Sequence, residues 1–165
     1  MGNNWSNLGI PQKGWELVDV YDVREDGQSV QDTDYETCMM CNNERIRYVH
    51  VLVHKDIKDK FKVGCICAEK MTDDPVTPKL LEERLRQSAN RKINYAKRKW
   101  KVTQTGNYKL KFEGHFLLIF YDNKTAKYKG KIDSKFGRKS FETIIEVKMA
   151  LLKGIDYYKL KYGNN

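Results

Sequence analysis

The sequence lacks the motifs that mark the common enzyme classes. Only three prolines and three histidines occur among its 165 residues. It contains no glycine-rich phosphate loop, no Ser/His/Asp set and no predicted element with two carboxylates paired for general acid–base catalysis. These absences predict that the protein is not an enzyme and has no catalytic residues.

Long apolar stretches are missing as well. No run approaches the roughly 18 apolar residues that a membrane-spanning helix needs. The first eight residues, M-G-N-N-W-S-N-L, have neither the basic segment nor the apolar stretch of a secretory signal peptide. The sequence therefore predicts a cytoplasmic protein that has no membrane partner.

Positive charge is in excess, and it is distributed unevenly. The formal net charge is +9. Residues 1–74 hold 9 Lys/Arg against 14 Asp/Glu (net −5), whereas residues 75–165 hold 22 against 8 (net +14). A basic half beside a mildly acidic half favours a polyanionic partner, and nucleic acid is the commonest one. A lysine-rich solvated surface is the alternative interpretation.

The hydrophobic pattern predicts an α+β fold. Its first part, residues 1–74, is expected to be a β-rich, zinc-ribbon-like or treble-clef-like block that binds zinc. Alternating or β-branched segments predict strands at 15–23, 46–54 and 61–64. A helix that starts near Ala68 would complete the treble-clef pattern.

A long cationic helix is predicted to connect this block to the rest of the chain, within residues 75–104. Thr77 is predicted to be its N-cap and Pro78 its first helical residue. An apolar stripe along it predicts a helix over residues 78–101. The stripe consists of Leu81, Leu85, Ala89, Ile93, Ala96 and Trp100. Three arginines repeat every seven residues on another side of this helix: Arg84, Arg91 and Arg98.

Residues 105–165 have the pattern of a β-β-β-α module, a three-stranded antiparallel sheet with one helix. The predicted strands are 108–112, 116–121 and 128–132. Turn residues, including Glu113 and Gly114, separate them. Ser140 is predicted to cap the final helix, and Gly154 to stop it.

All four cysteines lie in the first part, as two close pairs. Two residues separate Cys38 from Cys41, and one residue separates Cys65 from Cys67. Four thiolates in two pairs fit a tetrahedral structural zinc site that leaves no open position for water. Residues two apart on extended chain face the same side, so Cys65 and Cys67 are expected to point at one ion. The sequence thus predicts one structural Zn²⁺ held by all four cysteines.

Other interpretations of the cysteines are less well supported. A disulfide is disfavoured because the sequence has no secretion signal. His50 and His54 lie on one face of the predicted second strand, so either could replace a cysteine as a ligand. The commoner environment for each is nevertheless solvent or a hydrogen bond.

The residues around the cysteines resemble a family of small, uncharacterised bacterial and phage proteins with four cysteines. The matching stretches are residues 45–50 (R-I-R-Y-V-H) and 63–68 (V-G-C-I-C-A), followed by the arginine-rich helix. The resemblance covers residues 15–100. That family has no assigned activity, so the resemblance implies an origin in a phage or another mobile element.

The last part is similar in layout to the sheet-plus-helix modules of plant ethylene-response-factor domains and integrase arm-binding domains. Residues 138–151 (R-K-S-F-E-T-I-I-E-V-K-M-A-L) are similar to the helix entry of those modules. This similarity implies DNA binding. With the preceding helix included, the order α-β-β-β-α is that of a double-stranded-RNA-binding domain.

Strand alternation is expected to place five lysines on one sheet face: Lys109, Lys111, Lys127, Lys129 and Lys131. Such a face can lie across phosphates or enter a major groove, where lysines add affinity rather than sequence reading. With Arg84, Arg91, Arg98 and Arg138, these lysines predict a non-catalytic, zinc-stabilised nucleic-acid-binding protein, with duplex DNA favoured. Two alternatives remain. One is a double-stranded-RNA binder, and the other is an anti-CRISPR-like inhibitor that binds a host defence nuclease.

Overall fold

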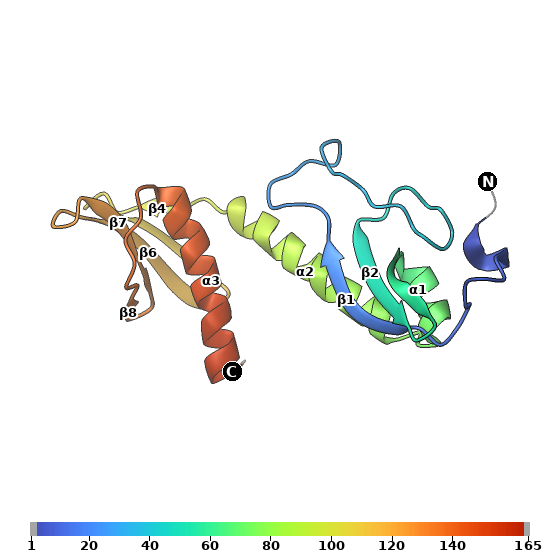
Figure 1. The fold of residues 1–165 in the computed structure, drawn as a ribbon. Coiled ribbons are helices and arrows are strands. Elements are labelled where there is room, and N and C mark those ends of the chain that lie inside the picture. Colours follow the sequence, from blue (N-terminus) through green and yellow to red (C-terminus); the bar gives the residue numbers. More distant parts are fainter. Residues whose placement is uncertain (1–2, 164–165) are drawn as a thin grey trace. The chain divides into compact units, whose positions relative to one another are not determined.

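Two antiparallel sheets, each with its own hydrophobic core, organise the chain (Figure 1). The computed structural model describes residues 3–163, which fall into two units with a boundary between Ile93 and Asn94. Three α-helices and the two sheets give the described residues a mixed α/β character. No helix within residues 3–163 has both the length and the apolar character that a bilayer crossing needs.

The first unit is built on a three-stranded sheet of order β1-β2-β3. Its strands are β1 (Glu16–Asp22), β2 (Tyr48–His54) and β3 (Ile57–Val63). A short 3-10 helix, η1 (Asn4–Ser6), precedes them, and two helices follow: α1 (Cys65–Thr72) and α2 (Thr77–Ala96). Central β2 is buried over its first five residues, as its β-branched composition predicts. β3 is longer than predicted, because Ile57 pairs directly with His54 across the hairpin.

The core of the first unit takes its side chains from β2, β3, α1 and the loop that carries Cys38 and Cys41. Leu52 and Met71 are fully buried there, and the rings of Trp15 and Phe61 lie 4.7 Å apart. Cys38 and Met40 are also fully buried. The cysteine loop is therefore part of this core and not a surface attachment.

Helix α2 is shorter than the predicted helix. It ends at Ala96, and Lys101 already belongs to a strand, so the prediction of a helix to residue 101 is wrong. Its start is capped by Asp74, whose Oδ1 accepts the N–H groups of Val76 (2.9 Å) and Thr77 (3.0 Å). Thr77 is the first residue of the helix, so the prediction that it is the N-cap is wrong. Ile93 is 48% exposed, so the predicted apolar stripe is not buried along its whole length.

The second unit contains a five-stranded sheet of order β4-β5-β6-β7-β8. Its strands are β4 (Lys101–Val102), β5 (Tyr108–Phe112), β6 (His115–Asp122), β7 (Lys127–Ile132) and β8 (Lys135–Phe136). The three predicted strands are confirmed, and two short edge strands are added to them. Glu113 and Gly114 both have positive φ angles, 49° and 83°, which is the geometry of a tight hairpin turn.

Helix α3 (Ile144–Tyr162) covers one face of this sheet and corrects both predicted helix ends. Thr143, not Ser140, is the N-cap: its side chain accepts the Glu146 N–H, and the Glu146 carboxylate accepts the Thr143 N–H at 2.9 Å. Gly154 lies inside the helix. A Cβ at this position would be 2.6 Å from Ile132 Cδ1, so glycine permits close packing on β7 and does not stop the helix.

Candidate metal centre and basic sheet face

Three of the four cysteines approach one another in the first unit. The sulfur atoms of Cys38, Cys41 and Cys67 all lie within 4.8 Å of one another. Thiolates bound to one tetrahedral zinc ion at about 2.3 Å are roughly 3.8 Å apart. Cys38 and Cys67 are buried, whereas Cys41 is exposed. The group is thus compatible with one metal ion near the surface of the core.

Backbone hydrogen bonds shape the loop that presents the first two sulfurs. The Cys38 N–H donates to the Asn43 carbonyl (2.8 Å), and the Asn42 N–H donates to the Cys38 carbonyl (2.9 Å). Asn42 has a φ angle of 62°, a conformation that asparagine tolerates better than most residues. The Met39 N–H donates to the Lys62 carbonyl at 2.9 Å, which fixes the loop to β3.

Cys67 comes from the first turn of α1, and the start of this helix overturns the extended backbone expected for the second pair. The helix begins at Cys65, not near Ala68. Residues two apart on a helix point about 200° apart around its axis. Cys67 therefore joins Cys38 and Cys41, whereas Cys65 groups with His50 and Glu82.

Electrostatics prepare Cys38 for metal binding. The thiol of Cys67 donates to it, and the N–H groups of Cys41, Gly64 and Met40 assist, so the pKa of Cys38 lies below its usual range although burial opposes this. The same contact with Cys38, together with burial, raises the pKa of Cys67. A thiolate is the form of cysteine that binds metals, so the lowered pKa of Cys38 favours the metal-binding form of this residue.

Cys65 and His54 lie outside the three-cysteine group. The Cys65 sulfur is 3.5 Å from Glu69 Oε1. Burial, followed by the charges of Glu82 and Glu69, raises the pKa of Cys65 to about 12. The ring of His54 packs against Trp15 at 5.2 Å between centroids, and its Nδ1 accepts the Asp56 N–H at 3.1 Å. His54 is thus held by ordinary core contacts.

In the second unit, strand register places the predicted lysines on one face of the sheet. Lys109 pairs with Leu118, and Leu118 pairs with Lys131. The same face takes the pairs Lys111–Phe116, Phe120–Lys129 and Asp122–Lys127. Directly paired residues share a face, so all five lysines lie on the face opposite the one that contributes to the core. Lys127 and Lys129 form ion pairs there, with Glu142 (2.7 Å) and Asp122 (2.6 Å).

A row of apolar side chains lies between the lysines, and sequence reasoning missed it. Phe116 and Phe136 are 64% and 65% exposed, and Leu118 and Phe120 are half-buried. The ammonium groups of Lys111 and Lys131 lie 5.4 and 4.8 Å from the ring centroids of Phe116 and Phe136. The sequence contained a sign of this row. Alternate residues of a strand face opposite sides, so the apolar residues at even positions of the run 116–121 had to lie on the lysine face.

The four predicted arginines are divided between the two units. Arg84 is exposed on α2 and lines a pocket with Leu81 and Leu85, and Arg91 is half-buried. Arg98 follows the end of α2, and its guanidinium lies 5.9 Å from the Phe112 ring centroid. Arg138 is exposed in the segment after β8. Arg84 and Arg91 thus belong to the first unit, whereas Arg98 and Arg138 belong to the second unit, as do the five lysines.

Comparison with known proteins gave no match to any family model, curated protein or solved structure. The geometry of the two sites is therefore the basis for a functional proposal.

Proposed function

We propose that this protein binds nucleic acid without catalysing a reaction, through the lysine–phenylalanine face of β5, β6, β7 and β8, and that a structural zinc ion stabilises the first unit. The observation that carries the proposal is the coincidence of the two side-chain types on one face. Lysines surround a row of exposed phenylalanines that α3 does not cover.

The charge of the second unit supports a polyanionic partner. Residues 94–165 contain 17 Lys/Arg and 6 Asp/Glu. Lysines on a sheet face neutralise phosphates and release counterions, which supplies affinity without sequence specificity. The ion-paired Lys127 and Lys129 are expected to contribute less than Lys109, Lys111 and Lys131, because a phosphate must compete with an existing carboxylate.

The phenylalanines favour unpaired bases over the duplex DNA that the lysines alone suggested. Stacking of one base on an aromatic side chain contributes about 1–3 kcal/mol and does not depend on which base is present. Bases inside a duplex are already stacked on each other and cannot use an exposed ring. The face therefore suits single-stranded DNA or RNA, with Phe116 and Phe136 as stacking platforms.

The order of elements around the three cysteines supports zinc as the metal of the first unit. A tight loop supplies Cys38 and Cys41, a β-hairpin follows, and the first turn of α1 supplies Cys67. This is the order of a treble-clef zinc site, in which the last ligands come from a helix start. A thiolate site of this kind suits the reducing cytoplasm.

The nucleic-acid proposal is tested by fluorescence anisotropy with single-stranded DNA, single-stranded RNA, duplex DNA and duplex RNA. Phe116→Ala is expected to weaken single-strand binding about 5- to 150-fold, the equivalent of one stacked base. Lys109→Ala is expected to weaken binding and to reduce the salt slope of log K by about one unit.

Tyr157→Ala is the matched control. Tyr157 is 56% exposed on α3, and the ammonium of Lys161 lies 5.7 Å from its ring, yet it is not on the proposed face. Unchanged binding in this variant supports the face. If only the duplexes are bound, the stacking model is wrong, and the face binds nucleic acid through phosphate contacts alone. If the wild type binds none of the four nucleic acids at low salt, the nucleic-acid proposal is excluded and a protein partner is favoured.

A further inference from the structure

We propose that His50, Cys65 and Glu82 form a second metal-binding site in the first unit, separate from the three-cysteine group. One ring nitrogen of His50, the Cys65 sulfur and a Glu82 carboxylate oxygen all lie within 4.8 Å of one another. The three residues come from β2, α1 and α2. Folding of the first unit therefore brings together three ligand types from distant parts of the chain.

His50 supplies the strongest indication. It is fully buried, and its Nε2 lies 3.1 Å from the carbonyl oxygen of Pro78. A carbonyl oxygen can only accept, so Nε2 carries the proton and Nδ1 keeps its lone pair. Nδ1 is buried and has no hydrogen-bond partner among the described residues. A buried nitrogen without a partner is costly, and a metal ion bound at Nδ1 would remove that cost.

The contact with Pro78 has the form of a support for a metal ligand. Histidines that bind metals commonly donate their other ring N–H to a backbone carbonyl, which fixes the tautomer and the ring orientation. Pro78 lies in the first turn of α2, the helix that also carries Glu82. The same helix thus orients the imidazole and provides the carboxylate.

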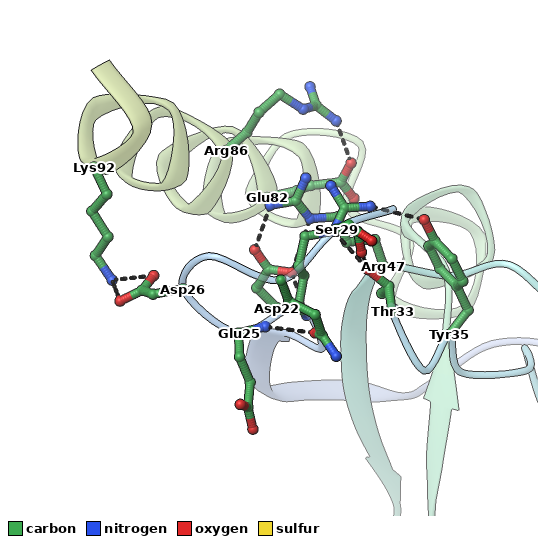
Figure 2. A network of polar contacts seen from close by, with 12 residues as sticks. Asp22, Glu25, Asp26, Ser29, Thr33, Tyr35, Arg47, Glu82, Arg86 and Lys92 are labelled. Carbon is green, nitrogen blue, oxygen red and sulfur yellow. Dashed lines mark hydrogen bonds and ion pairs between the residues drawn. The ribbon is translucent and has the colours of Figure 1, made fainter. Parts of the chain in front are cut away.

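The charge of the site suits a cation. The Glu69 carboxylate lies 3.5 Å from the Cys65 sulfur, which adds a second acidic group to the site. Lys79 (3.4 Å) and Arg86 (2.7 Å) each contact one carboxylate oxygen, of Glu69 and Glu82 respectively. Figure 2 shows the Arg86–Glu82 contact on α2. Each carboxylate has a second oxygen that these contacts do not use.

The nitrogen, sulfur and oxygen donors indicate a metal ion of intermediate softness. Zn²⁺ is such an ion and binds all three donor types. A groove of about 720 Å³, lined in part by Cys65, Cys67 and Glu82, gives an ion a path to the site. Three protein ligands leave a fourth position, which Glu69 or water can fill.

The test is a zinc titration of the untagged full chain, with bound metal counted by mass spectrometry and Co²⁺ absorption as a second readout. We expect two ions per chain in the wild type. Glu82→Gln keeps the size of the side chain but removes its charge. It is expected to lower the affinity for the second ion 10- to 100-fold without changing the affinity for the first.

Glu83→Gln is the control, because Glu83 also contacts Arg86 (3.0 Å) but lies outside the cluster. It should retain two ions. Cys65→Ser distinguishes this site from the four-cysteine site that the sequence predicted. A single ion that is lost in both Cys65→Ser and Cys67→Ser but is unchanged in Glu82→Gln would overturn the proposal. So would a wild-type protein that binds no ion.

Discussion

The two units of the chain differ in what fills their cores. The core of the first unit contains Cys38, Met40 and Cys67 among its buried side chains, so its packing includes the candidate metal centre. The core of the second unit contains aliphatic and aromatic side chains from the sheet and α3, such as Ile119, Val147 and Leu152. From the proposed structural metal, we expect the folding of the first unit to depend on metal and the second unit to fold by apolar burial alone.

Metal removal should separate the two units most clearly. A structural zinc ion contributes ~10–16 kcal/mol of apparent folding free energy in small zinc domains. A strong chelator, or Cys38→Ser, is therefore expected to unfold the first unit and to leave the second folded. Two-dimensional NMR would follow this as a loss of dispersed amide signals from residues 3–93 only. Identical spectra with and without chelator would contradict a structural metal.

A substitution that creates a cavity in the second core tests whether this unit is stabilised by apolar burial and not by metal. Ile119 is fully buried, so Ile119→Ala should lower the free energy of unfolding of the second unit by about 2–5 kcal/mol. This loss should be the same with and without chelator, as measured by urea denaturation. Ile145→Ala is the control, because Ile145 is 73% exposed and its truncation should change stability by less than about 0.5 kcal/mol.

An ion pair gives the smallest expected effect and is confined to the first unit. Burial alone would raise the pKa of Asp22, but hydrogen bonds from Arg47 (2.9 and 3.0 Å) and from the Arg24 N–H outweigh it and hold that pKa below 3.8 (Figure 2). A carboxyl group whose pKa is lower in the folded state stabilises the fold above its unfolded pKa. This stabilisation is lost as the pH falls through the folded pKa.

Asp22→Asn should therefore destabilise the first unit by about 1.5–3 kcal/mol at neutral pH, the usual contribution of a hydrogen bond to a charged group. The difference between variant and wild type should shrink as the pH falls below 3.8. Denaturation curves across this range measure the effect. A difference that does not depend on pH would show that the variant acts through packing and not through charge.

Side-chain periodicity predicted the strands more reliably than it predicted the helix ends. β5, β6 and β7 lie where alternation placed them, because a sheet with one buried face requires that pattern. The ends of α3 could not be read in the same way. Thr143 and Ser140 can both cap a helix, but only Thr143 has a glutamate three residues later, Glu146, which completes a capping box. The prediction did not use this signal. The pairing of Phe141 with Tyr128 is consistent with Ser140 lying outside the helix.

The candidate metal residues show the same limit. The spacing of Cys38 and Cys41 indicated a tight loop, and the structure has one. The single residue between Cys65 and Cys67 has opposite consequences on a strand and on a helix, so the sequence left their directions unspecified. The partners of Cys65 are on β2 and α2, and no local pattern relates those segments.

The two outermost strands of the second unit affect how the protein behaves at high concentration. β4 and β8 are only two residues long, and each includes one lysine, Lys101 and Lys135. A short, charged edge offers few free backbone groups to a neighbouring chain, which opposes the growth of a continuous sheet across molecules. The second unit can therefore expose Phe116 and Phe136 on one face of its sheet, because its edge strands have little tendency to pair with other chains and form fibrils.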